Sequence, residues 1–126
     1  MRPLREFLDE ETECDRLLEV VDGCGELDRK IYLTLLDAES RQSIADIAEA
    51  VDRDRSTTYR AVRRLHEHGY VDREQETYDH GGYCYRYSPV DPDEVASALR
   101  ERILECHERL DDLIEEFRET YGRQSG

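Results

Sequence analysis

The chain has 126 residues, which is enough for one compact domain with an appended helix and too few for a two-lobed enzyme. Its formal net charge of −14 is an acidic excess that normally argues against nucleic acid as a partner. No segment approaches the roughly 20 apolar residues that span a bilayer, and the first residues lack the apolar core of a signal peptide. We therefore expect a cytoplasmic protein with no membrane partner.

The charge is unevenly distributed along the chain. Residues 41–73 hold seven arginines against six acidic residues, and residues 55–64 contain four arginines and no carboxylate. This local cationic patch predicts a nucleic-acid-binding surface on an anionic body. Lys30 is the only lysine, and acid in this excess indicates a halophilic cell, with an acidic mesophilic protein as the alternative. At molar salt the Debye length is about 3 Å, so the acid would repel DNA only weakly.

The first 24 residues predict an amphipathic helix, either continuous or broken by the acidic run at residues 10–13. Its apolar positions have helical spacing: Leu4, Phe7, Leu8, Cys14, Leu17, Leu18 and Val21. Gly23 and Gly25 end this segment, and a second helix follows over residues 27–36. We expect these two helices to pack together.

Local signals then predict two helices and a hairpin. Ser43 and Asp46 have the spacing of a capping box, which begins a short helix. A polar turn at residues 52–54 precedes a longer helix over residues 56–68, which Gly69 ends. Strands over residues 70–74 and 83–88, with Gly81 and Gly82 between them, predict the hairpin.

A final helix is predicted over residues 92–121, beginning with Asp91 as cap and a proline in the first turn. Its apolar residues repeat at alternating intervals of four and three, as in a coiled-coil seam: Leu99, Ile103, Cys106, Leu110, Leu113 and Phe117. We expect this seam to form a homodimer. Packing against the first helix of the same chain is the alternative, but a helix of roughly 45 Å exceeds so small a core.

Three helices followed by a hairpin predict a mainly α fold with a small β-hairpin wing, the winged helix-turn-helix. We divide the chain into an N-terminal helix (1–24), a DNA-binding domain (25–90) and a dimerisation helix (91–126). The segment IADIAEAVDRDRSTTYRAVRRLHEHGYVDRE resembles the DNA-binding segment of TrmB-like and related archaeal regulators, of haloarchaeal type. This resemblance covers residues 27–88 and implies that the third helix of the domain reads the major groove. Many TrmB-like proteins carry a separate sugar-binding domain, which we do not expect here, and so no sugar ligand.

The predicted recognition helix offers forked donors for base edges and hydroxyls for phosphates, with Arg60 the first choice for reading a base. A solvated helix face is the alternative, but such faces usually mix charges of both signs. The wing carries Glu74, Glu76 and Asp79, which argues against wing contacts. The predicted DNA contacts are Ser43, Arg53, Arg55, Ser56, Thr57, Thr58, Tyr59, Arg60, Arg63, Arg64 and Arg73.

Four cysteines in a cytoplasmic chain are not expected to form disulfides. Cys14 and Cys106 fall on apolar stripes and predict core residues, and Cys84 predicts an exposed one. Cys24 lies between glycines just before a helix, where the helix dipole can lower a thiol pKa, so we expect it to be a redox-sensing thiol or simply a tolerated turn residue. A site made from the cysteines and His107 lacks the C-x-x-C spacing of metal centres, so no metal or other cofactor is predicted.

The sequence thus predicts a homodimeric, sequence-specific transcriptional regulator that binds a roughly palindromic operator in double-stranded DNA. Two alternatives stay open: a protein-interaction module of the transcription machinery that does not bind DNA, and a metal-responsive regulator. Catalysis is not expected, because no nucleophile, base and orienting acid occur at recognisable spacing and no phosphate-binding glycine loop is present.

Overall fold

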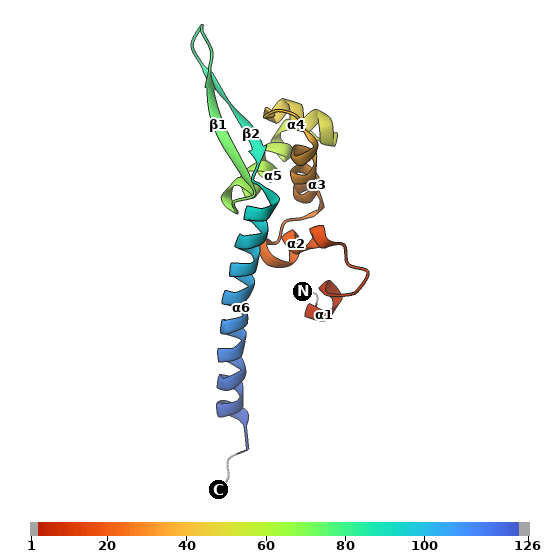
Figure 1. Cartoon of the computed structure of the whole chain (residues 1–126), viewed down its shortest axis with the longest axis vertical. Helices are drawn as coiled ribbons and strands as arrows, with labels where there is room; N and C mark the ends of the chain where they lie inside the picture. The colour runs from red at the N-terminus through yellow and green to blue at the C-terminus, as the bar shows by residue number, and fades with distance from the viewer. Residues whose placement is uncertain (1–2, 124–126) are drawn as a thin grey trace.

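The computed structural model describes residues 3–123 as a small helical core with a projecting hairpin and a long terminal helix (Figure 1). This arrangement confirms the predicted mainly α fold with a two-stranded wing. The elements, in chain order, are α1 (Leu4–Phe7), the 3-10 turn η1 (Cys14–Arg16), α2 (Leu17–Asp22), α3 (Glu26–Asp37), α4 (Ile44–Val51), α5 (Arg55–Glu67), β1 (Val71–Thr77), β2 (Tyr83–Pro89) and α6 (Pro92–Tyr121).

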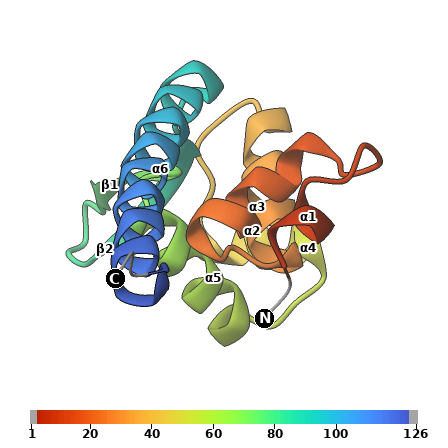
Figure 2. The ribbon, with the colours of Figure 1, turned by 90° about the horizontal axis from the view of Figure 1, so that it is seen from below.

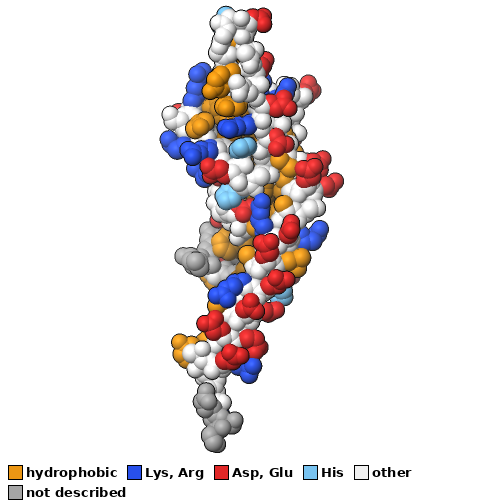
Figure 3. Space-filling view, turned by 90° about the vertical axis from the view of Figure 1, so that its left-hand side faces the viewer, with side chains coloured by type: hydrophobic (Ala, Val, Ile, Leu, Met, Phe, Trp, Pro, Cys, Tyr) orange, Lys and Arg blue, Asp and Glu red, His pale blue; other side chains and the backbone are white. Residues whose placement is uncertain are grey.

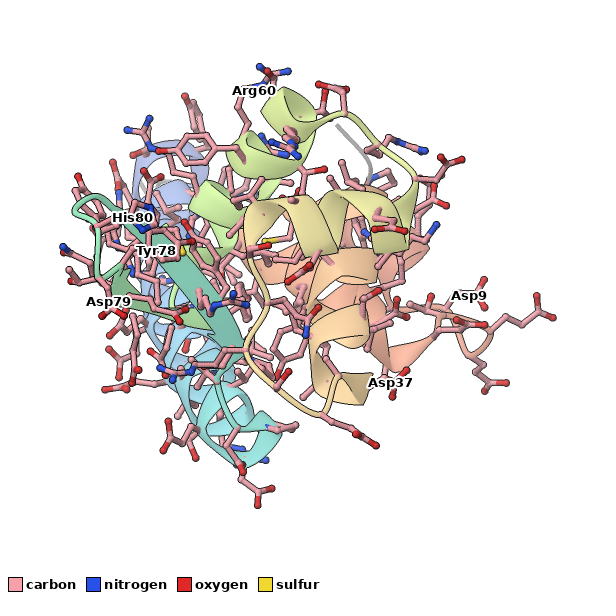
Figure 4. The ribbon with its side chains drawn as sticks, turned by 90° about the horizontal axis from the view of Figure 1, so that it is seen from above. Asp9, Asp37, Arg60, Tyr78, Asp79 and His80 are labelled. Carbon is pink, nitrogen blue, oxygen red and sulfur yellow. The ribbon has the colours of Figure 1, made fainter. Side chains whose placement is uncertain are left out.

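The N-terminal segment is broken rather than one continuous helix. A loop separates α1 from η1, and there the Asp9 carboxylate accepts a hydrogen bond from the backbone of Glu11 at 2.8 Å. Like charges three and four residues apart, as at Glu10 and Glu13 and at Asp9 and Glu13, disfavour a helix at this point. Figure 4 shows Asp9 at the edge of the molecule, and Leu18 is the only residue of η1 and α2 that is buried. The two residues before Pro3, part of the predicted helix, lie outside the described residues.

Side-chain caps fix the turns on both sides of α4. The Ser43 hydroxyl accepts from the Asp46 amide and the Asp46 carboxylate accepts from the Ser43 amide, both at 3.1 Å, so the predicted capping box is confirmed. Asp52 ends α4 with a left-handed backbone (φ 55°). Asp54 then caps α5 by accepting from the Thr57 amide at 3.0 Å. These caps set the short turn between α4 and α5.

Helices α3, α4 and α5 pack around one apolar core, to which each contributes buried aliphatic side chains. The hairpin is an antiparallel pair in which Arg73 lies opposite Tyr87. Gln42 and Tyr87 exchange backbone hydrogen bonds of 2.9 and 2.8 Å, which attach the hairpin to the segment before α4. Seen from below, the wing lies on one side of α6 and the helical core on the other (Figure 2).

Only the first turns of α6 contact this core. Val95 and Leu99 are its two buried residues, so Leu99, predicted to face a partner, instead packs within its own chain. The rest of α6 projects past every other element (Figure 1). Its remaining apolar residues are exposed: Ile103, Leu104, Leu110, Leu113, Ile114, Phe117 and Tyr121. The alternative that the seam packs along the first helix of the same chain is therefore wrong beyond Leu99.

A buried ion pair joins α3 to α5. Asp28 is only 2% exposed, and its carboxylate accepts from Arg64 Nε at 3.0 Å and Nη2 at 2.8 Å. A charge removed from water needs such a paired, hydrogen-bonded partner. This pair therefore holds α5 against α3.

The variant Arg64→Met should lower the free energy of unfolding by about 2–3 kcal/mol, because it leaves the Asp28 carboxylate buried without a partner. Urea denaturation measures this loss, and adding Asp28→Leu should recover most of it. The matched control is Arg63→Met on the same helix, which breaks an exposed pair with Glu67 and should cost no more than about 0.5 kcal/mol. Equal losses for the two single variants would contradict the assignment.

Candidate nucleic-acid interface

One face of α5 is polar and open to solvent. Ser56, Tyr59, Arg60 and Arg63 are exposed at helical spacing along this face, while the opposite face is buried in the core. Figure 4 shows Arg60 pointing away from the fold. Among the described residues neither Arg55 nor Arg60 forms an ion pair, whereas Arg63 donates to Glu67 at 3.0 Å. The helix thus presents two unpaired guanidinium groups at its N-terminal half.

The N-terminus of α5 is capped by an ionised carboxylate. Hydrogen bonds from the Thr57 hydroxyl and amide lower the pKa of Asp54, so its carboxylate stays charged and keeps capping the helix. The Thr57 hydroxyl also accepts from Arg60 Nη2 at 3.4 Å. Asp54 therefore orders this end of α5 through Thr57, which in turn contacts the guanidinium of Arg60.

Three predicted DNA contacts have other roles in the structure. Thr58 is fully buried, so the prediction that its side chain contacts DNA is wrong. Arg64 turns from α5 toward α3 and donates to Asp28, although its side chain keeps 51% exposure. Ser43, predicted as a DNA contact, already donates its amide hydrogen to Asp46, whose lowered pKa keeps a negative charge at the start of α4. Local spacing predicts the capping box of Ser43 but does not reveal the burial of Thr58 or the long-range partner of Arg64.

The two faces of the hairpin differ in charge. Because side chains alternate along a strand, one face carries every acidic residue of β1 and the other carries none. The acidic face holds Asp72, Glu74 and Glu76 opposite Ser88, Arg86 and Cys84. The acid-free face holds Arg73, Gln75 and Thr77 opposite Tyr87, Tyr85 and Tyr83. Glu74 and Glu76, two of the three acids that argued against wing contacts, are therefore confined to one face, while the third, Asp79, lies in the turn at the tip of the hairpin.

The acids on the acidic face are largely paired with nearby arginines. Glu74 forms an ion pair with Arg41, and Glu76 with Arg86. Arg86 also lies 3.7 Å from the Asp46 carboxylate. These pairs neutralise two of the three acids on the acidic face. The alternation of acidic and neutral residues in β1 is the sequence signal that identifies the acid-free face.

The acid-free face of the wing adjoins the exposed face of α5. The Arg73 guanidinium lies over the Tyr85 ring, 4.3 Å from its centroid, in a cation–π contact. Burial raises the pKa of the Tyr87 hydroxyl, and Arg73, Tyr85 and Tyr59 of α5 are its electrostatic neighbours. Figure 3 shows arginine and lysine side chains gathered beside hydrophobic ones in the upper half, with acids over the long helix below. We call the exposed face of α5 together with the acid-free face of the wing the cationic face.

The two remaining predicted contacts, Arg53 and Arg55, lie beside this cationic face. Arg53 is exposed just before α5 and donates to the carbonyl of Asp52 at 3.1 Å. Arg55 is exposed in the first turn of α5. Both lie near the turn that Asp54 caps, at the edge of the molecule that carries Arg60. The structure therefore places Arg53 and Arg55 at the N-terminal end of α5.

Cys24 differs most from its predicted character. Its side chain is buried, and burial, followed by the nearby Asp28 and Asp22 carboxylates, raises the thiol pKa to about 11. The predicted lowering of this pKa is wrong, because desolvation outweighs the dipole of α3. Cys14 and Cys106, predicted as core residues, are exposed, and Cys84 is half-buried, with its sulfur accepting from the Tyr78 hydroxyl at 2.9 Å.

The described residues offer neither a metal centre nor a membrane span. No group of three or more histidine, cysteine, aspartate or glutamate side chains there is arranged to hold a metal ion. Over the same residues, no helix is long and apolar enough to cross a membrane.

The sequence and the fold both resemble those of archaeal proteins. Two uncharacterised proteins of Methanocaldococcus jannaschii, MJ1082 and MJ1503, are each 34% identical to this chain over 82% of its length and over 85% and 77% of their own. A possible transcriptional regulator from Methanosarcina mazei Go1 superposes with a TM-score of 0.74 at 19% identity, covering 86% of this chain and 94% of that one. TrmBL2, described as an archaeal chromatin protein with a novel mode of DNA binding, superposes with a TM-score of 0.56 at 23% identity, covering 84% of this chain and 37% of its own.

These neighbours confirm the predicted winged helix-turn-helix fold. The model of the family described as "Sugar-specific transcriptional regulator TrmB" matches residues 18–93, which include α2 to β2 and therefore the whole cationic face. This chain belongs to the TrmB family, whose members are transcriptional regulators and not enzymes.

Proposed function

We propose that this protein is a homodimeric, sequence-specific DNA-binding regulator that acts in the cytoplasm. The observation that carries the proposal is the cationic face, where arginine side chains and a wing face free of acid adjoin in a chain of net charge −14. In an acidic protein, arginines concentrated on the exposed face of one helix indicate that this face binds an anionic partner.

The exposed face of α5 fits the major groove. Arg60 points away from the fold and carries the forked donors that pair with the O6 and N7 atoms of guanine. Ser56 and Thr57, one turn earlier, offer hydroxyls to the flanking phosphates, and Arg53 and Arg55 offer charge. Tyr59 and Arg63 complete the contact. Arg64 is assigned to Asp28 and not to a base.

The wing adds a second contact on the same side. Arg73 is held over Tyr85 by its cation–π contact, so its guanidinium is ordered before DNA binds. Gln75 and Thr77 continue the acid-free face toward the tip of the hairpin. This face meets the sugar-phosphate backbone next to the groove that α5 enters, while the acidic face points away from DNA.

High salt makes the acidic body compatible with DNA binding. At molar ionic strength the Debye length is about 3 Å, so charges beyond the contact surface barely interact with the phosphates. Contacts of the cationic face lie within that distance and persist. The excess of acid over base, with Lys30 as the single lysine, fits a halophilic cell.

The exposed seam of α6 supports the homodimer. Ile103, Leu110, Leu113 and Phe117 lie on one stripe of a helix that projects from the core. A continuous apolar stripe of this length is stable in water when a second copy covers it. Twofold symmetry then places two α5 helices in successive major grooves, about 34 Å apart, on a roughly palindromic operator.

The acidic surface also favours a second candidate, a protein-interaction module that contacts the transcription machinery without binding DNA. The two candidates differ in the role of the cationic face. Direct binding to duplex DNA, with a salt dependence that follows the arginines, separates them.

The variant Arg60→Ala should weaken binding to a selected operator about 10- to 100-fold, because a bidentate arginine–guanine pair contributes about 1–3 kcal/mol. Arg55→Ala should instead weaken specific and random duplexes alike and reduce the salt slope by about one. Operators selected from random duplex, followed by fluorescence anisotropy over a range of KCl, provide both values. The control Arg118→Ala, on distal α6, should leave affinity unchanged. Wild-type protein that binds no duplex at any salt would favour the interaction module.

The variant Leu113→Glu should convert a dimer of the 14.9 kDa chain into a monomer, because a buried carboxylate in the seam has no partner. Sedimentation equilibrium measures the mass. Glu108→Gln, on the opposite side of α6, should remain dimeric and controls for changes in the helix itself. A wild-type protein that sediments as a monomer would refute the homodimer.

Cys24 should be inert in the folded protein, which removes the support for redox sensing. In a variant with Cys14, Cys84 and Cys106 changed to serine, a thiol reagent should modify Cys24 at neutral pH only after unfolding by urea. In the folded state its reaction should accelerate as pH rises toward about 11, because the thiolate forms only there. Rapid modification of the folded protein at neutral pH would restore Cys24 as a sensor candidate.

A further inference from the structure

The end of the recognition helix α5 is tied to α6 by one arginine. His68 is the C-cap of α5, and its carbonyl accepts from Arg102 Nη2 at 2.8 Å. The next residue, Gly69, has φ of +83° and turns the chain into β1. A side chain at Gly69 would have its first carbon 3.7 Å from the same guanidinium. The Arg102 guanidinium therefore lies next to the residues at which the recognition helix ends.

The same guanidinium also forms an ion pair with a carboxylate of α2. Arg102 Nη1 donates to Asp22, the last residue of α2, whose side chain is only 10% exposed. Asp22 also accepts a hydrogen bond from the Tyr70 hydroxyl, and its other oxygen lies 3.8 Å from His68 Nδ1. Burial and this hydrogen bond raise the pKa of Tyr70, so its hydroxyl keeps the proton that it donates. We call Asp22, His68, Tyr70 and Arg102 the clasp.

The clasp is the last contact between α6 and the DNA-binding domain. Val95, Leu99 and Arg102 lie at intervals of four and three on the side of α6 that faces the core. The next residue at this spacing, Cys106, is exposed. From Arg102 to Tyr121 the helix extends roughly 28 Å at 1.5 Å per residue. A tilt of about 10° at the clasp would therefore move the far end by about 5 Å, more than the rise of roughly 3.4 Å per base pair.

We infer that Arg102 is a positioning residue that fixes the angle between the recognition helix and the dimerisation helix and thereby sets the spacing of operator half-sites. This inference rests on the proposed homodimer. The Arg64–Asp28 pair holds α5 on α3 without involving Arg102. The apolar contacts of Val95 and Leu99 hold α6 in place but are non-directional. Charge-assisted hydrogen bonds have defined geometry, and Arg102 supplies those that fix the angle.

The first experiment compares Arg102→Met with wild type on operators whose half-sites are moved apart or together one base pair at a time. Wild type should prefer one spacing by about tenfold or more, whereas Arg102→Met should lose most of that preference. Methionine keeps the apolar stem of the side chain, so the dimer mass and the affinity for an isolated half-site should stay unchanged. Arg100→Met, exposed two residues earlier on the same helix, should retain the wild-type preference. An unchanged preference in Arg102→Met would overturn the inference.

A second measurement is independent of DNA and of the operator. Spin labels on an exposed position of α5 and of distal α6 within one chain, diluted with unlabelled protein, report the distance between the two helices. Asp22→Asn, which keeps the shape of the side chain and loses its charge, should broaden this distance distribution while the melting temperature of the core changes little. A distribution as narrow as that of wild type would refute the clasp, even if Arg102→Met fails to fold. A broadened distribution in a protein that binds no DNA would retain the clasp and reject the proposed function instead.

Discussion

Two largely buried carboxylates orient the recognition helix, and the placement of the cationic face depends on them. Asp28 binds Arg64 in the middle of α5, and Asp22 holds the end of α5 through Tyr70 and Arg102. Each carboxylate is costly to remove from water, so each requires its hydrogen-bonding partners to be in one position. The cost of burying two charges is thus converted into a defined orientation for α5.

The same requirement divides the charge of the molecule. Several acids of the DNA-binding domain are buried beside arginine, engaged in helix caps, or paired on the acidic face of the wing. What remains on the cationic face is arginine, tyrosine and hydroxyl groups. A net charge of −14 therefore gives a poor description of the surface that meets a partner. The distribution of charge over faces, set by the fold, decides which partner fits.

Local signals in the sequence predicted most of the helices and the hairpin, because their information lies within a few residues. The capping box at Ser43, the helix begun by Asp91 and the glycine turn of the wing are of this kind. Burial could not be predicted in the same way. Thr58 and Cys24 were misassigned because their surroundings come from residues distant in the chain, as do the Asp28–Arg64 and Asp22–Arg102 pairs, which are 36 and 80 residues apart. The period-two alternation of acids in β1 does predict the two wing faces, whereas the total number of acids in the hairpin does not.

The projecting part of α6 begins only after its last contact with the core at Arg102. In the proposed homodimer, residues that control the association of the two copies therefore lie beyond those that orient the recognition helix. Substitutions in the distal turns would then change how readily two copies associate without changing the spacing of the two recognition helices. Affinity between copies and choice of DNA site would be separable properties, although one helix encodes both.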